Sequence, residues 1–194
     1  MLTLYHSPMS RSSRFVWMLE EVGQPYEIKY VTIQRHDGSG GRDPANAHPE
    51  GKVPALDHDG QLIIESGAIA LYLSDAFPAA KLGPAVGDPK RGEYLMWLFY
   101  YAAEVEPLMM ARMMGQGENP MYARMYELMG ERLHNALSTG PYIMGEQFTA
   151  ADVLFGSAFM YMRNQFPEDP AIDAYAERLA ARPAMKASQA RENP

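Results

Sequence analysis

Residues 51–73, GKVPALDHDGQLIIESGAIALYL, decide the fold class, because two short strand patterns here lead directly into an apolar helix pattern. Pro54 opens the first strand pattern, residues 54–57, and a proline inside a strand would lose a ladder hydrogen bond. The second strand pattern, residues 61–64, follows the turn sequence HDG, which is typical of a β-hairpin. The apolar residues 66–76 then predict a helix. The stretch therefore predicts a β-β-α unit with a proline at the entry to its first strand.

The residues before this stretch predict a β-α-β unit. Residues 2–5, LTLY, form a short strand pattern, and residues 12–22 have helical periodicity that ends at Gly23. Residues 26–31 alternate in polarity and predict a second strand, which a right-handed crossover would place parallel to the first. Followed by the β-β-α unit, this order predicts a thioredoxin-like α/β domain with a mixed sheet.

The second half of the chain shows no strand pattern. Helices are expected over residues 90–114, 120–137, 149–162 and 171–181. Three of their starts pair an N-capping residue with a proline at the first helical position: Asp88-Pro89, Asn119-Pro120 and Asp169-Pro170. This half is therefore expected to be an all-α helical bundle.

Proline and glycine mark the connections between these parts. Residues 32–51 are rich in Gly, Pro and Asn and predict a long loop, while residues 78–88 predict an inter-domain linker. The expected domains are a thioredoxin-like domain over 1–77, the linker, and the helical domain over 89–194.

Composition and charge argue against nucleic acid as a partner. The 194 residues are 47% hydrophobic and 21% charged, with a net charge of -7. Residues 1–80 carry 6 basic and 10 acidic side chains, and the remainder carries 11 and 14. Without a basic face or a Lys/Arg run, the electrostatic footprint of nucleic-acid binding is missing.

The chain contains no cysteine, which excludes disulfides, thiolate metal sites and mechanisms that use a protein thiol. The N-terminal sequence MLTLYHSPMSRSSRF lacks the pattern of a signal peptide, and no apolar segment approaches the ~20 residues that span a bilayer. A cytoplasmic location without membrane attachment is the expectation.

Two features of residues 51–73 suggest a ligand site. A cis Val53-Pro54 bond would turn the Val53 backbone N–H and C=O outward, where an extended peptide could pair with them. Glu65 and Ser66 could bind the ammonium and carboxylate of an α-amino acid, with Ser66 capping the following helix. The alternative for each feature is structural: Pro54 begins an edge strand, Ser66 is only a cap and Glu65 is a surface acid.

The same motifs resemble those of the cytosolic glutathione transferases, whose pattern is G-x-V/I-P-x-L, D-G, then E-S and an apolar helix. GEQFTAADVLFGSAF, residues 145–159, is similar to the family's capping box, in which Thr149 and Asp152 cap each other. ARPAMKAS, residues 181–188, resembles the family's closing segment. The resemblance covers nearly the whole chain and implies glutathione as co-substrate.

The resemblance assigns roles to individual residues. Val53 would pair with the cysteinyl backbone of glutathione beside Pro54, and Glu65 and Ser66 would bind the γ-glutamyl ammonium and carboxylate. Lys52 would contact the glycyl carboxylate or stay in solvent. His48 and Gly67 depart from the family pattern, which commonly has Asn and Arg, Gln or Asn at these positions.

The residue that activates the glutathione thiol is expected near the end of the first strand. SPMSRSSRFV resembles the serine-type pattern P-x-S-x-x-x-R of the phi class, which places Ser10 at the catalytic position at the start of a helix whose dipole favours a thiolate. Ser12, Arg11 and Tyr5 are the alternatives. The serine cluster could also serve only to cap the helix.

The second substrate is expected to be a hydrophobic electrophile against the methionine-rich helix of residues 90–114, with Met109 and Met113 as weak candidates for its pocket. Met side chains fill the core as readily, and Pro107 is expected to bend this helix. Alternatives to a transferase are a glutathione-dependent isomerase, dehalogenase or reductase, or a non-catalytic binding module. A homodimer is implied by the resemblance alone.

Overall fold

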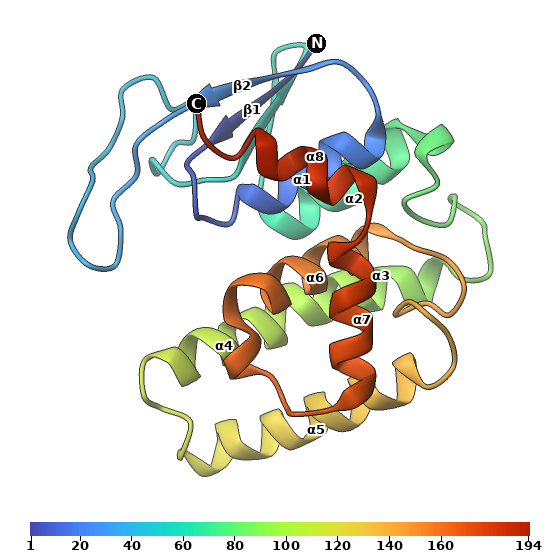
Figure 1. Cartoon of the computed structure of the whole chain (residues 1–194). Helices are drawn as coiled ribbons and strands as arrows, with labels where there is room; N and C mark the ends of the chain where they lie inside the picture. Colours follow the sequence, from blue (N-terminus) through green and yellow to red (C-terminus); the bar gives the residue numbers. More distant parts are fainter. The chain divides into compact units, whose positions relative to one another are not determined.

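The computed structural model describes all 194 residues, which divide into two compact units (Figure 1). One unit contains Met1–Ala80 together with Pro183–Pro194, and the other contains Lys81–Arg182. The expected boundaries assigned the C-terminal residues to the helical domain, whereas Pro183–Pro194 belong to the first unit. The reason is that α8 (Pro183–Ala190) packs against α1 (Ser13–Val22) and buries Met185 and Ser188.

The first unit contains a four-stranded mixed sheet, which confirms the predicted fold class. The strands are β1 (Leu2–His6), β2 (Tyr26–Tyr30), β3 (Ala55–His58) and β4 (Gln61–Ile64), in the spatial order β2-β1-β3-β4. β1 and β2 are parallel, whereas β3 is antiparallel to both β1 and β4. The parallel pair is joined by α1, as the sequence predicted.

Two helices cover the same side of this sheet: α1 contacts β1, and α2 (Ser66–Ala76) contacts β4 (Figure 1). Alternate strand residues explain the arrangement, because Leu4 and Leu56 are fully buried while Tyr5 points to the opposite face. On that opposite face Tyr5 belongs to an apolar cluster that also contains Val31, Val53, Ala55, Ile33 and Ile64.

The second unit is helical, as predicted, apart from two isolated β-bridges in residues 142–147. Its α-helices are α3 (Arg91–Tyr100), α4 (Glu106–Met113), α5 (Pro120–Leu137), α6 (Ala150–Met162) and α7 (Pro170–Ala180). Short 3-10 turns occur at Pro78–Ala80, in the first unit, and at Arg163–Gln165. None of the helices combines the length and the apolar character that crossing a membrane requires.

The predicted helix over residues 90–114 is interrupted by a π-helical segment, Tyr101–Val105. Pro107 lies just after it and has no N–H to offer the carbonyl four residues earlier, a defect that a widened turn accommodates. Sequence periodicity alone does not report such a local widening, because the apolar pattern continues through it.

Two of the three predicted helix caps are confirmed. The Asn119 side chain accepts a hydrogen bond from Met121 N–H at 3.0 Å, and Asp169 accepts one from Ala171 N–H at 2.7 Å. The prediction at Asp88 is wrong, because α3 begins at Arg91 and the Asp88 carboxylate instead accepts from Lys90 N–H in the preceding turn.

Candidate functional site

The strand register brings the predicted glutathione residues to one end of the sheet. Tyr5 lies opposite Ala55, and Ala55 lies opposite Ile64. The loop that follows β1, the Val53-Pro54 pair that precedes β3, and the Glu65-Ser66 pair that follows β4 therefore leave the sheet together. These three segments lie within one compact unit.

The spacing of the three segments suits a short extended peptide. β1, β3 and β4 are consecutive neighbours, so the loop after β1 and the start of α2 are separated by two strand spacings. At about 4.8 Å each, these spacings amount to roughly 10 Å. Three residues in an extended conformation cover roughly the same length.

The peptide bond between Val53 and Pro54 is cis, which confirms the prediction from the sequence. β3 begins only at Ala55, so Pro54 takes no donor away from the sheet ladder. Neither the N–H nor the C=O of Val53 forms a hydrogen bond with another protein group. Both groups therefore lack a partner within the protein.

Glu65, rather than Ser66, occupies the N-cap position of α2, so the prediction that Ser66 caps this helix is wrong. Ser66 is the first helical residue, and Glu65 has a positive φ of 71° and makes no capping hydrogen bond with its side chain. Glutamate rarely adopts this backbone conformation. At the start of α2 the first N–H groups therefore donate no capping hydrogen bond to the Glu65 carboxylate or the Ser66 hydroxyl. A helix start of this kind is suited to bind an amino-acid head group.

The serines after β1 form a local hydrogen-bond network. Ser10 Oγ lies 2.6 Å from Ser7 O and 2.8 Å from Ser12 Oγ, and it accepts from Ser12 N–H at 3.2 Å. Ser12 is completely buried, whereas Ser10 is partly exposed. Of these two serines, only Ser10 can be reached by a ligand without a rearrangement.

The other two candidates for the thiol contact have different surroundings. Tyr5 is 8% exposed, and its ring packs in the same cluster as Val53 with the Lys29 ammonium 5.3 Å from the ring centroid. Arg11 is exposed at the start of the α1 segment. Tyr5 therefore shares a cluster with Val53, the residue predicted to pair with the cysteinyl backbone.

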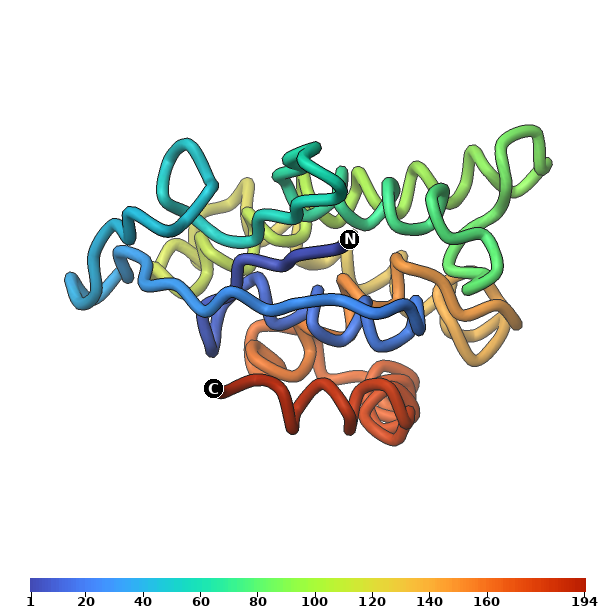
Figure 2. Tube along the Cα trace, turned by 90° about the horizontal axis from the view of Figure 1, so that it is seen from above, coloured from blue at the N-terminus to red at the C-terminus, as the bar shows by residue number.

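Two residues that sequence reasoning did not assign hold the serine loop in place. The Arg35 guanidinium donates to Pro8 O at 2.8 Å and to Ser7 Oγ at 3.3 Å. The Glu192 carboxylate accepts from Met9 N–H at 2.7 Å and from the Ser13 hydroxyl. Figure 2 shows the C-terminal end of the chain beside the turn that follows β1.

The turn before Val53 is built from local side chains. His48 Nδ1 accepts from Glu50 N–H at 3.1 Å, and Asn46 donates to Lys52 O at 2.9 Å. Burial lowers the pKa of His48, so the neutral imidazole that this contact requires is favoured. Lys52 forms an exposed ion pair with Glu50. Its contact with the glycyl carboxylate of glutathione stays a prediction.

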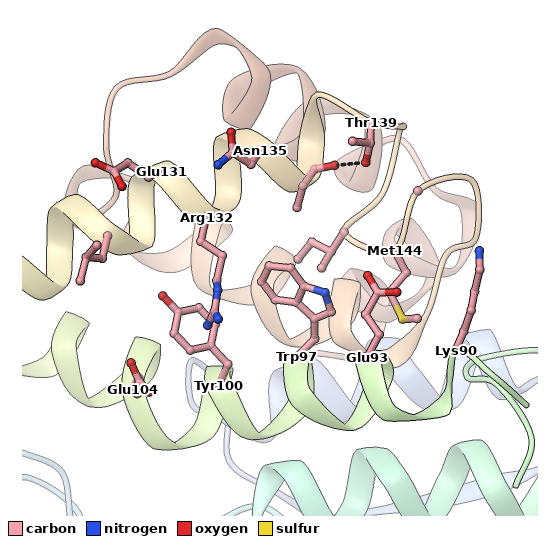
Figure 3. Close-up of a pocket in the computed structure, with 14 residues that line it drawn as sticks. Lys90, Glu93, Trp97, Tyr100, Glu104, Glu131, Arg132, Asn135, Thr139 and Met144 are labelled. Atoms are coloured by element: carbon pink, nitrogen blue, oxygen red, sulfur yellow. Dashed lines mark hydrogen bonds between the residues drawn. The ribbon is translucent and has the colours of Figure 1, made fainter. Parts of the chain in front are cut away.

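Met109 and Met113, the predicted contacts of the second substrate, differ in accessibility. Met109 is completely buried in the helical unit, whereas Met113 is 55% exposed. A pocket of about 830 Å³ in this unit contains neither of them. In Figure 3, Arg132 of α5 reaches toward Tyr100 and Trp97 of α3, with its guanidinium 4.2 Å from the centre of the Tyr100 ring. This pocket contains none of the predicted site residues.

Comparison with known proteins identifies the family. Residues 4–84 match the family model of the glutathione S-transferase N-terminal domain. Glutathione S-transferase 3 of Schizosaccharomyces pombe is 31% identical over 177 residues, which cover 78% of this chain and 70% of that protein. Glutathione S-transferase GstA of Escherichia coli O157:H7 is 26% identical over 95% of this chain and 96% of its own length.

A solved structure agrees with both halves of the fold. The sphingomonad glutathione S-transferase complexed with glutathione superimposes with a TM-score of 0.80 at 26% identity, covering 98% of each chain. The agreement extends over the sheet, the helices and the C-terminal segment. This chain belongs to the glutathione S-transferase family of enzymes.

Proposed function

We propose that the first unit binds glutathione across the end of its sheet and that the enzyme transfers the activated thiol to an apolar electrophile. The thiolate sulfur would form a bond to an electrophilic carbon, and a leaving group would depart with its electron pair or the electrons would move onto the acceptor. The observation that carries the proposal is the convergence of Val53, Glu65 and the serine loop at one end of the sheet.

Each segment would hold one part of the tripeptide. The unpaired Val53 N–H and C=O would pair with the cysteinyl backbone as an added strand. The Glu65 carboxylate would receive the γ-glutamyl ammonium, and the first N–H groups of α2 with the Ser66 hydroxyl would receive its carboxylate. With the tripeptide held in this order, its thiol would lie near the loop after β1.

The experiment that tests this function combines binding with turnover. The purified chain is expected to be retained on immobilised glutathione, to elute with free glutathione, and to conjugate chlorodinitrobenzene. An isomerase, dehalogenase or reductase would bind glutathione and act on a different acceptor in a substrate panel. Binding without turnover across that panel would instead favour a non-catalytic module.

We propose Ser10 as the hydroxyl that donates to the thiolate. Its partial exposure and its place at the start of the α1 segment support this role, while the complete burial of Ser12 disfavours that residue. Tyr5 remains the second candidate because its ring packs in the same cluster as Val53.

Replacement of Ser10 by alanine is expected to raise the pKa of bound glutathione, because the thiolate loses a hydrogen-bond donor. A shift of one unit corresponds to about 1.4 kcal/mol. Turnover at neutral pH should fall and recover partly in alkaline buffer, while glutathione affinity changes little. The measurement is the ultraviolet absorbance of the bound thiolate as pH is varied. A shifted titration in Tyr5→Phe with an unchanged one in Ser10→Ala would assign the role to Tyr5.

The acceptor, assembly and location are further parts of the proposal. Met113 is exposed and could contact an apolar electrophile, whereas Met109 lies in the core. A homodimer in the cytoplasm is proposed from family membership, and sedimentation equilibrium of the purified chain tests the dimer. A sedimentation mass that remains near 21.7 kDa at all concentrations would contradict it.

A further inference from the structure

A chain of hydrogen bonds runs inward from Ser10 to a buried histidine. Ser10 Oγ lies 2.8 Å from Ser12 Oγ, and Ser12 Oγ lies 2.8 Å from His6 Nδ1. His6 Nε2 lies 3.0 Å from the carbonyl oxygen of Glu192. His6 and Ser12 have no exposed surface, so Ser10 is the only member of the serine-histidine chain that meets solvent.

The direction of these hydrogen bonds follows from their chemistry. A carbonyl oxygen can only accept, so Nε2 of His6 carries a proton toward Glu192. In the neutral imidazole Nδ1 is then an acceptor, and the Ser12 hydroxyl donates to it. Ser12 Oγ accepts from Ser7 N–H at 3.1 Å, and it can accept the Ser10 proton as well.

In this resting arrangement the serine protons point into the protein. The Ser10 proton goes to Ser12 Oγ or to Ser7 O, and because Ser12 N–H already donates to Ser10 Oγ, one lone pair of Ser10 is left for the ligand. A hydroxyl in this state accepts a hydrogen bond from a thiol, whereas stabilisation of a thiolate needs a donor. The Ser10 proton must therefore turn toward the sulfur, and reversal of the chain does this while it also takes up the thiol proton.

We propose that His6 is the proton acceptor that reverses this chain when glutathione binds, an inference that rests on the proposed position of the thiol at Ser10. The thiol S–H bond breaks and its proton moves to Ser10 Oγ, the Ser10 proton moves to Ser12 Oγ, and the Ser12 proton moves to His6 Nδ1. The products are a thiolate that accepts a hydrogen bond from Ser10 and an imidazolium at His6. His6 and Ser12 act through Ser10 and are positioning residues.

The groups around His6 act in opposite directions on its pKa, and the net shift is downward, which favours the neutral ring at rest. Burial lowers the pKa of His6, while the backbone carbonyl and the carboxylate of Glu192 raise it, with Oε2 3.8 Å from Nε2. From β2 the Tyr30 ring faces the imidazole edge-on with its centroid at 5.6 Å. The Arg35 guanidinium contacts Ser7 and Pro8 on the adjoining loop. A carboxylate at this distance is suited to stabilise an imidazolium that forms only during activation.

Nitrogen NMR of the full-length protein with labelled histidine tests the relay, using glutathione and S-methylglutathione as probes. The two ligands present the same head groups, but only glutathione carries a thiol proton. Glutathione is expected to convert His6 from the neutral Nε2-protonated ring to the doubly protonated ring at neutral pH. S-methylglutathione should bind and leave His6 neutral.

Two variants separate the relay from a merely structural role. Ser12→Ala interrupts the chain and should raise the apparent pKa of bound glutathione by about one unit, with His6 neutral in the complex. Glu192→Gln preserves the shape of the carboxylate but removes its charge, so it should shift the same titration upward without loss of glutathione affinity.

Several results would overturn the relay. The relay is wrong if His6 stays neutral while bound glutathione ionises. It is also wrong if the variants lose stability or glutathione affinity but leave the titration of the bound thiol unshifted. If neither glutathione nor S-methylglutathione binds, the proposed function fails together with the relay. If S-methylglutathione protonates His6 as glutathione does, the proton does not come from the thiol and the relay is wrong.

Discussion

Replacement of Asp152 by alanine is expected to destabilise the helical unit by about 3–5 kcal/mol, because it removes the acceptor of several buried donors. Asp152 Oδ1 accepts from Ile143 N–H at 2.9 Å and from the Tyr175 hydroxyl at 2.8 Å. Oδ2 accepts from Thr149 N–H at 2.7 Å and lies 3.2 Å from the Thr149 hydroxyl. Asp152 is completely buried, so water cannot replace these contacts without opening the structure.

The measurement exploits the two tryptophans, which lie in different units: Trp17 in the first and Trp97 in the second. In a Trp17→Phe background, Trp97 fluorescence reports denaturant unfolding of the helical unit. Tyr175→Phe is the matched control, since it removes a single donor and should cost about 1 kcal/mol. A loss of less than about 1 kcal/mol in Asp152→Ala would show that the carboxylate does not organise this unit.

The capping box and the order of the elements were predictable from the sequence, because both depend on residues that are close in the chain. Thr149 and Asp152 are separated by one helical turn, and the structure shows Asp152 accepting from Thr149 N–H as the box requires. The strand patterns on either side of HDG likewise predicted the β3-β4 hairpin. Parallel pairing of β1 and β2 followed from the intervening helix.

The parts that could not be predicted depend on distant residues or on backbone dihedral angles. Glu192 contacts Met9 across 183 positions in sequence, and neither residue has a pattern that signals the other. The bounds of α2 match the prediction, but the positive φ of Glu65 puts Glu65 at the N-cap position, although serine is the better capping residue in isolated helices. Helix periodicity also could not show that Ser12 is sealed beneath Ser10.

The positive φ of Glu65 supports the proposal that this residue belongs to a ligand site. A glutamate held at φ 71° makes no capping bond in return. Strained backbone conformations persist where the surrounding structure imposes them and are concentrated at ligand sites. In the proposed function the adjoining Ser66 N–H and hydroxyl would donate to a carboxylate, and the pair would bind both charges of one amino-acid head group.

Glu65→Gln and Ser66→Ala are each expected to weaken glutathione binding by roughly 1.5–3 kcal/mol, the value of a charge-assisted hydrogen bond. The dissociation constant should therefore rise roughly 10- to 150-fold in isothermal titration calorimetry. The free energy of unfolding should change little, because the Glu65 side chain makes no capping hydrogen bond with the protein. Glu27→Gln, at an exposed acid on β2, is the matched control and should bind glutathione normally.

A glutathione analogue that lacks the α-amino group makes the assignment of Glu65 specific. If Glu65 receives the ammonium, the wild-type protein should bind this analogue about as weakly as Glu65→Gln binds glutathione, and the substitution should then cost little more. The two changes would thus be strongly non-additive, whereas Ser66→Ala should still weaken the analogue because its carboxylate is retained. Additive losses of affinity from Glu65→Gln and from removal of the amino group would show that the ammonium binds elsewhere. Unchanged glutathione affinity in both Glu65→Gln and Ser66→Ala would exclude the start of α2 from the glutathione site.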